Sequence, residues 1–474
     1  MAENTLSNPL KSEVLADFIV NTRTEDIPGD IRAKTVRHIL DSVGAGIAGA
    51  ASKECDILMK TLKAQGQSQG AAFLWGQGQT MAPINAALFN GVSAHSFELD
   101  DTGGCDHSGA VVVPAAFAAV DMAKAEGLVT TGEEFVTAIV LGYDVARRAL
   151  ESCGAYAPHN KAGFHSTGTC GTFGAAAAAA RLLKLDAKQT QMALGLAGSF
   201  SAGLWACVHD GAQSKRLHAG HAAQGGLMSA CLARDGFTGP TQIFEQVWGG
   251  FDHTYAKDSD VPQAWTEDLG KVWKIHRVSV KPHASCRSTH SSIDAVDILR
   301  KKMGFGADDV EKIEIIISAF VHGMCGAFDR NPMPAAQLSI PYSVAADLIY
   351  GDAMLPSFSR EKRNTSQIES LMKRISFRVD KNKPDLEEPT VIVTLKDGRV
   401  DQQQVAIPLG APANPLSDEG LFHKFRSVVG MVYDETQANT LIEKLMGIDQ
   451  CDDVYEAISK ELGKEPARRE LFDV

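Results

Sequence analysis

The stretch TVIVTLKDGRVDQQQVAI at residues 390–407 decides how the chain is divided, because it reads as two strands joined by a turn. Apolar and polar residues alternate with the period of two that is typical of strands, and the Lys-Asp-Gly sequence between them favours a hairpin. KIEIIIS (312–318) and VWKIHRVSV (272–280) alternate in the same way, and FRV (377–379) reads as a short strand. Helical patterns lie between these strands, at 288–303, 336–350 and 366–374.

On both sides of this α+β module the chain reads as helices joined by short loops. Apolar residues recur three and four positions apart at 10–22 and 31–49, and again at 421–432 and 435–448. GTFGAAAAAARLL (171–183), with its run of six alanines, predicts a buried helix that its neighbours approach closely. We therefore predict a mainly α protein, in which a large all-helical domain (1–270 plus 408–474) carries an inserted, smaller α+β lid domain (271–407).

The amino-acid composition and net charge limit the classes of molecule that the protein is expected to bind. The 474 residues include 44% hydrophobic and 22% charged side chains, which is ordinary for a folded protein. Lys and Arg number 46 against 58 Asp and Glu, so the formal net charge is −12. That excess of acid argues against a general nucleic-acid binder, which needs clustered cations to meet phosphates. It leaves room for a small anionic substrate held by a few local cations.

The sequence also predicts a cytoplasmic location. MAENTLSNPLKSEV has no basic start followed by an apolar core, so no secretory signal is expected. The longest apolar stretch, 109–120, is 12 residues long, and a membrane span needs about 20. Nine cysteines are widely spaced without a CxxC pair, which is typical of reduced thiols and argues against a disulfide framework, a zinc ribbon or an iron–sulfur site.

Acidic residues and histidines are concentrated in HSFELDDTGGCDHSGAVVVPA (95–115). Glu98, Asp100, Asp101, Asp106 and His107 fall within ten residues, just before an apolar helix. Carboxylates beside an imidazole can orient it and raise its basicity, whereas the alternative is that they cap the following helix. Cys105, His107 and the aspartates were also considered as metal ligands, but their spacing matches no standard site.

Two further segments place a cation or a histidine at the start of a helix of small residues. In KAGFHSTGTCGTFGA (161–175), His165 precedes Ser and Thr residues, which suits an anion site at a helix N-terminus or a simple cap. In HDGAQSKRLHAGHAAQGGLMSA (209–230), Lys215 and Arg216 are followed by His218 and His221. The two histidines share a helix face, but no HExxH glutamate supports zinc. Cations before a buried helix predict an anionic ligand instead.

A fourth segment, SVKPHASCRSTH (279–290), follows a predicted strand and contains Lys281, His283, Cys286 and Arg287. Cys286 beside His283 leaves thiol catalysis open, although nothing in the sequence determines their geometry. GxxxxGK[ST], GxSxG and HExxH are absent from the sequence, and the glycine strings that follow predicted strands lack GxGxxG, so no nicotinamide cofactor is expected.

Taken together, these segments resemble the MmgE/PrpD family, which includes 2-methylcitrate dehydratase, cis-aconitate decarboxylase and iminodisuccinate epimerase. The resemblance covers nearly the whole chain and rests on ILDSVGAGIAG (39–49), NAALFNGVSAHSFELDDT (85–102), GFHSTGTCGTFGAAAAAARLL (163–183), QSKRLHAGHAAQGGL (213–227), DGFTGPTQIFE (235–245), VKPHASC (280–286) and SIPYSVAADL (339–348). It implies a helical domain with an α+β lid, a homodimer, no metal or other cofactor, and an active site between the two domains.

Carried over by position, the family's active-site residues fall on the Asp101–Thr102 step, His107, His165, Lys215 and Lys281, with His283 and Tyr342 beside the substrate. Lys215 and Lys281 would hold substrate carboxylates, and His107 and His165 would move protons. Asp101 would orient one imidazole, and Thr102 would hydrogen-bond the substrate. The loop after Thr102, GGCDH, departs from members acting on methylcitrate or cis-aconitate, and Glu98 stands where many members have aspartate.

These roles indicate a cofactor-free lyase, a dehydratase or decarboxylase acting on a small di- or tricarboxylic acid. An epimerase or isomerase using the same histidines and lysines is the enzymatic alternative, and a non-catalytic polycarboxylate-binding protein is the other. No membrane or nucleic-acid partner is expected.

Overall fold

The structure is a computed structural model that describes residues 9–66, 69–209, 212–257, 259–468 and 471–472. Contacts within the chain divide it into two units. The helical unit comprises residues 1–96, 100–278 and 432–469, and the mixed unit comprises 97–99, 279–431 and 470–474. The mixed unit therefore includes a single tripeptide, 97–99, that is far in sequence from its main segment, 279–431.

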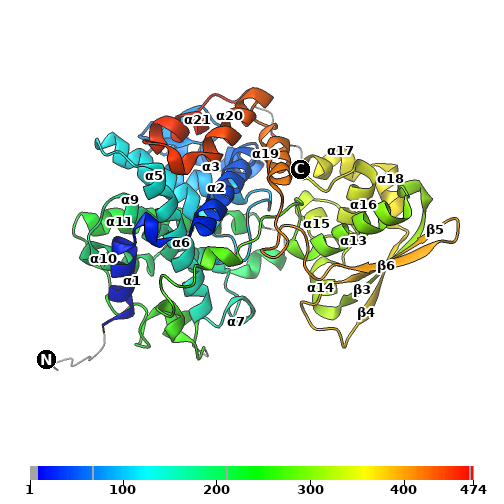
Figure 1. The fold of residues 1–474 in the computed structure, drawn as a ribbon, viewed down its shortest axis with the longest axis horizontal. Helices are drawn as coiled ribbons and strands as arrows, with labels where there is room; N and C mark the ends of the chain where they lie inside the picture. The colour runs from blue at the N-terminus through cyan, green and yellow to red at the C-terminus, as the bar shows by residue number, and fades with distance from the viewer. Residues whose placement is uncertain (1–8, 67–68, 210–211, 258, 469–470, 473–474) are drawn as a thin grey trace. The chain divides into compact units, whose positions relative to one another are not determined.

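Helices dominate the helical unit, as the sequence predicts (Figure 1). One short antiparallel strand pair, β1 (Ala72–Leu74) with β2 (Gln79–Met81), was not predicted. The helices of eight or more residues are α1 (Lys11–Asn21), α2 (Gly29–Gly49), α3 (Lys53–Ala64), α4 (Pro83–His95), α5 (Gly109–Ala125), α6 (Gly132–Ser152), α9 (Gly171–Leu182), α10 (Ala187–Ala197), α11 (Ser214–Arg234) and α20 (Glu435–Met446).

Small residues let the central helices approach one another closely. The alanines of α9 are fully buried, and α9 packs against α5, α6 and α11. A Cβ atom on Gly174 of α9 would lie 2.4 Å from the carbonyl oxygen of Gly142 on α6, so only glycine fits at this crossing. The predicted buried helix at 171–183 is therefore confirmed, and its lack of side-chain bulk determines how near its neighbours lie.

Replacing Gly174 with alanine is expected to lower the free energy of unfolding by about 1–3 kcal/mol, because the added methyl group overpacks the α6–α9 crossing. Thermal unfolding followed by circular dichroism measures this effect. Gly323→Ala is the matched control, because no atom lies within 4 Å of the position of its added Cβ. A Gly174→Ala variant that melts with the control would contradict the proposed close packing.

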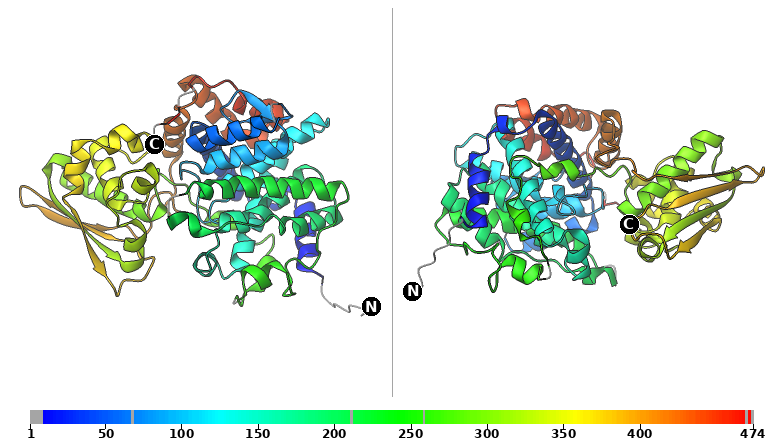
Figure 2. Two further views of the ribbon diagram at one scale, coloured as in Figure 1. Left: turned by 180° about the vertical axis from the view of Figure 1, so that it is seen from behind. Right: turned by 60° about the horizontal axis from the view of Figure 1, so that its bottom comes forward.

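The mixed unit contains a four-stranded sheet whose order is β4-β3-β5-β6. β3 (Val310–Ser318) pairs in parallel with β4 (Ile375–Asp380) and antiparallel with β5 (Thr390–Leu395), which pairs antiparallel with β6 (Val400–Gln404). The predicted hairpin and the strand at 312–318 are thus confirmed. Helices lie on one face of this sheet and leave the other open (Figure 2), and α13 (Arg287–Met303) contacts β5 and β6. The other helices of eight or more residues here are α16 (Ile340–Tyr350) and α19 (Asp418–Val429).

The strand predicted at 272–280 is wrong. Residues Lys274–Arg277 form a 3-10 turn, and the residues up to Val278 belong to the helical unit. The backbone N–H of Lys274 donates to Asp144 Oδ1 at 2.9 Å, so a side chain of α6 holds the segment where a strand would use a neighbouring backbone. Trp273, Ile275 and Val278 are buried, which accounts for the misleading alternation of apolar residues.

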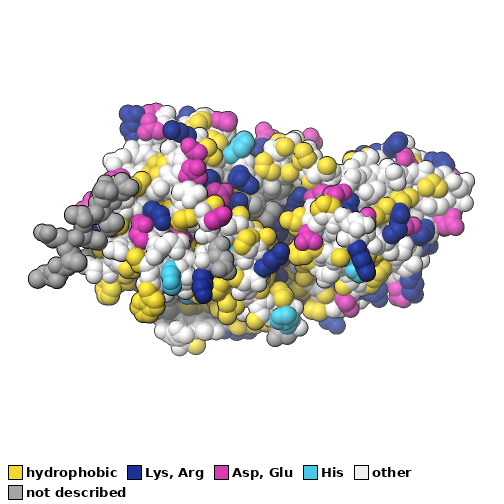
Figure 3. All heavy atoms as spheres, turned by 90° about the horizontal axis from the view of Figure 1, so that it is seen from below, with side chains coloured by type: hydrophobic (Ala, Val, Ile, Leu, Met, Phe, Trp, Pro, Cys, Tyr) yellow, Lys and Arg dark blue, Asp and Glu magenta, His cyan; other side chains and the backbone are white. Residues whose placement is uncertain are grey.

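Charges of both signs are mixed on the surface. On the face shown in Figure 3, lysine and arginine side chains are interspersed with aspartate and glutamate. Among the described residues, no helix combines the length and the apolar character that crossing a lipid bilayer requires.

Candidate active site

A strained loop between α4 and α5 supplies most of the titratable groups of the helical unit's candidate site. α4 ends at His95, and α5 begins at Gly109, preceded by Ser108 as its N-cap. Within the loop Asp106 has φ of 91°, a left-handed conformation that a non-glycine residue rarely adopts. This backbone directs the Asp106 carboxylate toward two histidines, with Oδ2 at 3.6 Å from His107 Nε2 and 3.7 Å from His165 Nε2.

The Asp100 carboxylate contacts two imidazoles at hydrogen-bond distance. Its Oδ1 lies 3.0 Å from His95 Nδ1 and its Oδ2 lies 2.9 Å from His107 Nδ1, and all three side chains are buried. Burial by itself raises the pKa of Asp100, but the charges and hydrogen bonds of His107 and His95 lower it well below its ordinary value. Asp100 is therefore an anion, and it fixes Nδ1 of both imidazoles as proton donors.

Asp101, the predicted orienting carboxylate, has different partners. Its Oδ1 accepts from the N–H of Gly109 at 2.9 Å, which caps α5, and its Oδ2 accepts from the Tyr143 hydroxyl at 2.7 Å. Its Oδ2 also lies 3.4 Å from Nδ1 of the buried His38, so Asp101 does contact one imidazole, while only its backbone oxygen reaches His107, 2.9 Å from Nδ1. The neighbouring Thr102 donates a long hydrogen bond of 3.5 Å to Asp106 Oδ1. Asp101 and Thr102 thus shape the loop in which His107 lies.

His165 is fully buried at the start of the short helix α8 (Ser166–Thr169). Its Nδ1 lies 2.9 Å from His218 Nδ1, and its ring centroid lies 4.5 Å from that of Trp205. Burial, with the nearby positive charge of Lys215 and the other histidines, lowers its pKa well below the ordinary value. His165 is consequently neutral near pH 7, and its Nε2 has no hydrogen-bond partner among the described residues.

Lys215 lies in the first turn of α11, with Nζ 5.6 Å from the centroid of the Trp205 ring. A lysine at the positive end of a helix dipole is unfavourable, which makes this turn a good place to receive an anion. The same charge, together with burial as the larger cause, lowers the pKa of His218 to about 4. The site of the helical unit thus combines neutral imidazoles with a half-buried ammonium group.

Lys281 lies in the mixed unit and is 3% exposed. Its Nζ donates to the backbone oxygen of Glu98 at 3.0 Å and lies 3.7 Å from Glu98 Oε2. A hydrogen bond from the Cys325 thiol is the main cause that lowers the pKa of Cys286 to about 6, and Lys281 contributes to this shift. The structure therefore groups Lys281, Glu98 and Cys286.

The two remaining predicted residues have structural partners of their own in the mixed unit. His283 Nε2 lies 3.1 Å from Asp294 Oδ1, whose second oxygen accepts from the N–H of Leu409. Tyr342 is fully buried, and its hydroxyl donates to the backbone oxygen of Ser357 at 2.5 Å.

Sequence reasoning did not single out His95 or Trp205, and it did not place Asp100, Asp106 or His218 among the predicted site residues. Asp100 lies beside the predicted Asp101, and only the loop geometry shows which carboxylate faces the imidazoles. His218 was considered with His221 as a zinc pair, whereas its Nδ1 lies against His165.

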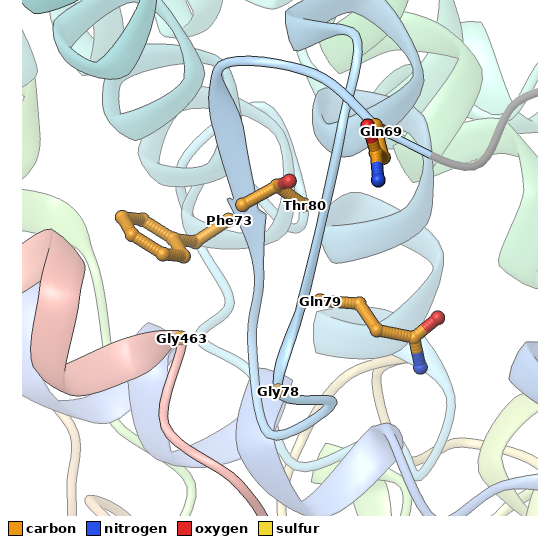
Figure 4. Close-up of a pocket in the computed structure, with 6 residues that line it drawn as sticks. All are labelled: Gln69, Phe73, Gly78, Gln79, Thr80 and Gly463. Carbon is orange, nitrogen blue, oxygen red and sulfur yellow. The ribbon is translucent and has the colours of Figure 1, made fainter.

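Two other features of the helical unit were considered as binding sites. His95, His107 and His165 each offer a ring nitrogen within 4.8 Å of the others, a set that can hold a divalent metal. A pocket of about 260 Å³ lies beside the β1–β2 pair and is lined by Gln69, Phe73, Gly78, Gln79, Thr80 and Gly463 (Figure 4). None of these lining residues is charged, so the pocket lacks a cation for a carboxylate.

Comparisons with known proteins agree with the resemblance found in the sequence. A protein from Aspergillus oryzae named cis-aconitate decarboxylase-like protein oryM is 28% identical, over 94% of this chain and 96% of its own length. Cis-aconitate decarboxylase from Aspergillus terreus is 25% identical over 96% of each chain, and that from Mus musculus is 28% identical over 93% of this chain and 91% of its own.

Family models give the same result along the chain. Residues 13–263 match the model described as the MmgE/PrpD N-terminal domain, and residues 283–447 match the MmgE/PrpD C-terminal domain. The first match alone spans more than half of the 474 residues, so this chain belongs to the MmgE/PrpD family.

Proposed function

We propose that this protein is a lyase that removes CO₂ or water from a small tricarboxylate, with its own side chains moving the protons. One observation carries the proposal: two buried histidines of one site lie in opposite electrostatic environments. His107 contacts the Asp100 anion at 2.9 Å, whereas His165 is buried near the Lys215 cation. The names of the relatives, cis-aconitate decarboxylases, support the same class of reaction and substrate.

We infer the acid and the base from these two environments. An anion in contact with an imidazole favours its protonated form, so His107 is the proton donor. Burial and a neighbouring cation favour the neutral form, so His165 is the proton acceptor. The sequence alone left this assignment open.

Both variants of the reaction then follow from the same groups. In a decarboxylation, the C–C bond to the departing carboxylate breaks, and its electron pair spreads over a dienolate that His107 protonates at carbon. In a dehydration, His165 removes the proton next to a carboxylate, and His107 protonates the departing hydroxyl. Lys215 and Lys281 would pair with substrate carboxylates and stabilise the charge that develops on them, and Thr102 would hydrogen-bond the substrate.

The proposal is tested by incubating the protein in D₂O with cis-aconitate, 2-methylcitrate and related acids. Release of CO₂ identifies a decarboxylase, a change in ultraviolet absorbance from a new double bond identifies a dehydratase, and deuterium uptake alone identifies an epimerase or isomerase. A protein that binds these acids, as shown by a raised melting temperature, and turns over none of them would be a binding protein, which would contradict the proposal.

Replacing Lys215 with methionine is expected to change the pH dependence as well as the affinity. The Lys215 charge is one cause of the low pKa of His165, so its loss raises that pKa. The base is active when unprotonated, so the acidic limb of kcat/KM should move to higher pH. KM should rise in parallel, because a substrate carboxylate loses its partner.

The control for this change is Lys188→Met, which removes a lysine from the exposed side of α10. It should leave both the pH profile and KM unchanged. If the acidic limb of the pH profile is unchanged in Lys215→Met, the charge of Lys215 does not act on the base, which would contradict the prediction.

The family resemblance further supports a homodimer. Sedimentation equilibrium of the purified protein tests this, and a monomer at micromolar concentration would contradict it.

A further inference from the structure

Two cysteines and a histidine that the proposed reaction does not use meet inside the helical unit. Cys153 follows the last residue of α6, His159 lies in α7 (Tyr156–Lys161), and Cys170 precedes the first residue of α9. Each offers a ligand atom, two thiol sulfurs and one ring nitrogen, and these atoms lie within 4.8 Å of one another. The three residues are 3%, 1% and 0% exposed, so the cluster is closed to solvent.

A neighbouring side chain holds the ring of the histidine in place. Its Nε2 lies 2.7 Å from the Thr169 hydroxyl oxygen, which fixes the ring. Its Nδ1 is buried and has no hydrogen-bond partner within the part of the chain that the structure describes. A buried polar atom without a partner is costly, and a second hydrogen bond that orients a ring is the usual companion of a histidine ligand.

We propose that Cys153, His159 and Cys170 form a site for a zinc ion or a similar thiophilic divalent cation, with a water molecule in the fourth position. Zinc binds thiolates at about 2.3 Å and imidazole nitrogen at about 2.0–2.1 Å. Tetrahedral geometry then places the ligand atoms roughly 3.5–3.8 Å apart, so separations of up to 4.8 Å need to shorten by at most about 1.3 Å.

Charge balance favours this occupant. Binding converts two neutral thiols into thiolates and releases two protons, so the divalent ion and its ligands carry no net charge in a buried place. The same ion would stabilise both thiolates and occupy His159 Nδ1.

The position of the cluster indicates what an ion there would do. It would connect the end of α6 to α7 and to the start of α9. His165, the proposed base, lies on the chain between His159 and Cys170. The ion would therefore stabilise the segment that places the base, without taking part in proton transfer. The inference is independent of the proposed reaction, since the zinc measurements below need no substrate.

The test uses the full chain, refolded in the presence of a reductant with and without zinc, because the closed cluster is expected to load during folding. Metal analysis should find one zinc ion per chain, and zinc should raise the melting temperature by about 5 °C at a concentration near 100 times Kd. Refolding with cobalt should produce a thiolate-to-cobalt charge-transfer band in the near ultraviolet. The cluster of His95, His107 and His165 contains no thiolate, so it cannot give this band.

Cys153→Ser and Cys170→Ser should lose the stoichiometric zinc, the charge-transfer band and the stabilisation by zinc. Cys55→Ser is the matched control, because it changes a buried cysteine of the same unit outside the cluster, and it should retain all three. If the serine variants do not fold, X-ray absorption of the wild-type zinc protein decides the matter, since two sulfur neighbours are expected. Absence of bound zinc after refolding with it, or a zinc environment without sulfur, would overturn the inference.

Discussion

Replacing His165 with glutamine is expected to lower turnover by about 10²–10⁴, with a smaller effect on substrate binding. Glutamine keeps a hydrogen-bonding side chain of similar reach, but it cannot accept the proton that the reaction moves. His165 is fully buried and neutral, with Nε2 lacking a hydrogen-bond partner among the described residues, which suits an acceptor of protons from substrate. Steady-state kinetics with the substrate found in the panel would measure the effect.

His221→Gln is the control for this prediction, because it makes the same change on α11, three residues after His218. Near-normal turnover in His165→Gln would transfer the role of base to another group. His107 and His283 would then be the next histidines to replace.

Replacing Asp100 with asparagine is expected to lower turnover on the order of 10³–10⁴, although the residue need not touch substrate. The carboxylate accepts from Nδ1 of both His95 and His107. An amide presents a donor toward at least one of these rings, which favours the wrong tautomer, and it removes the negative charge that faces His107. kcat should fall far more than KM rises, and the pH profile should lose the contribution of the proton donor.

Asp121→Asn is the matched control for Asp100→Asn. Asp121 is also a buried carboxylate of the helical unit, and burial raises its pKa to about 7, so its replacement removes less negative charge. It should retain turnover. Equal losses of turnover in the two variants would mean that Asp100 contributes only to stability. In that case Asp100→Glu, which keeps the charge, should not restore turnover.

Local patterns predicted the strands correctly where the backbone groups of a segment form hydrogen bonds with neighbouring strands. β3 and the β5–β6 hairpin were predictable because the alternation of their apolar residues reflects one buried face. The same alternation at 272–280 misled the prediction, since Trp273, Ile275 and Val278 are buried around a turn that Asp144 holds.

The sequence predicted which types of residue form the candidate site more easily than it predicted the role of each residue. Adjacent carboxylates at 100 and 101 look equivalent in sequence, and they differ because Asp101 caps α5 while Asp100 faces the imidazoles. Cys153, His159 and Cys170 are separated by spacings that match no standard metal motif, and the ends of three helices bring them together.

The tripeptide 97–99 has a consequence for exchanging parts between relatives. Its three successive backbone oxygens accept from buried side chains of the mixed unit, namely Gln337 to Phe97, Lys281 to Glu98 and Lys424 to Leu99. A chimera that carries this chain's 279–431 in another family member brings these donors to the host's own tripeptide. Because every residue has a backbone oxygen, such a graft needs to preserve only the path of the tripeptide backbone. The excised segment 279–431 alone would bury two ammonium groups and an amide without these acceptors.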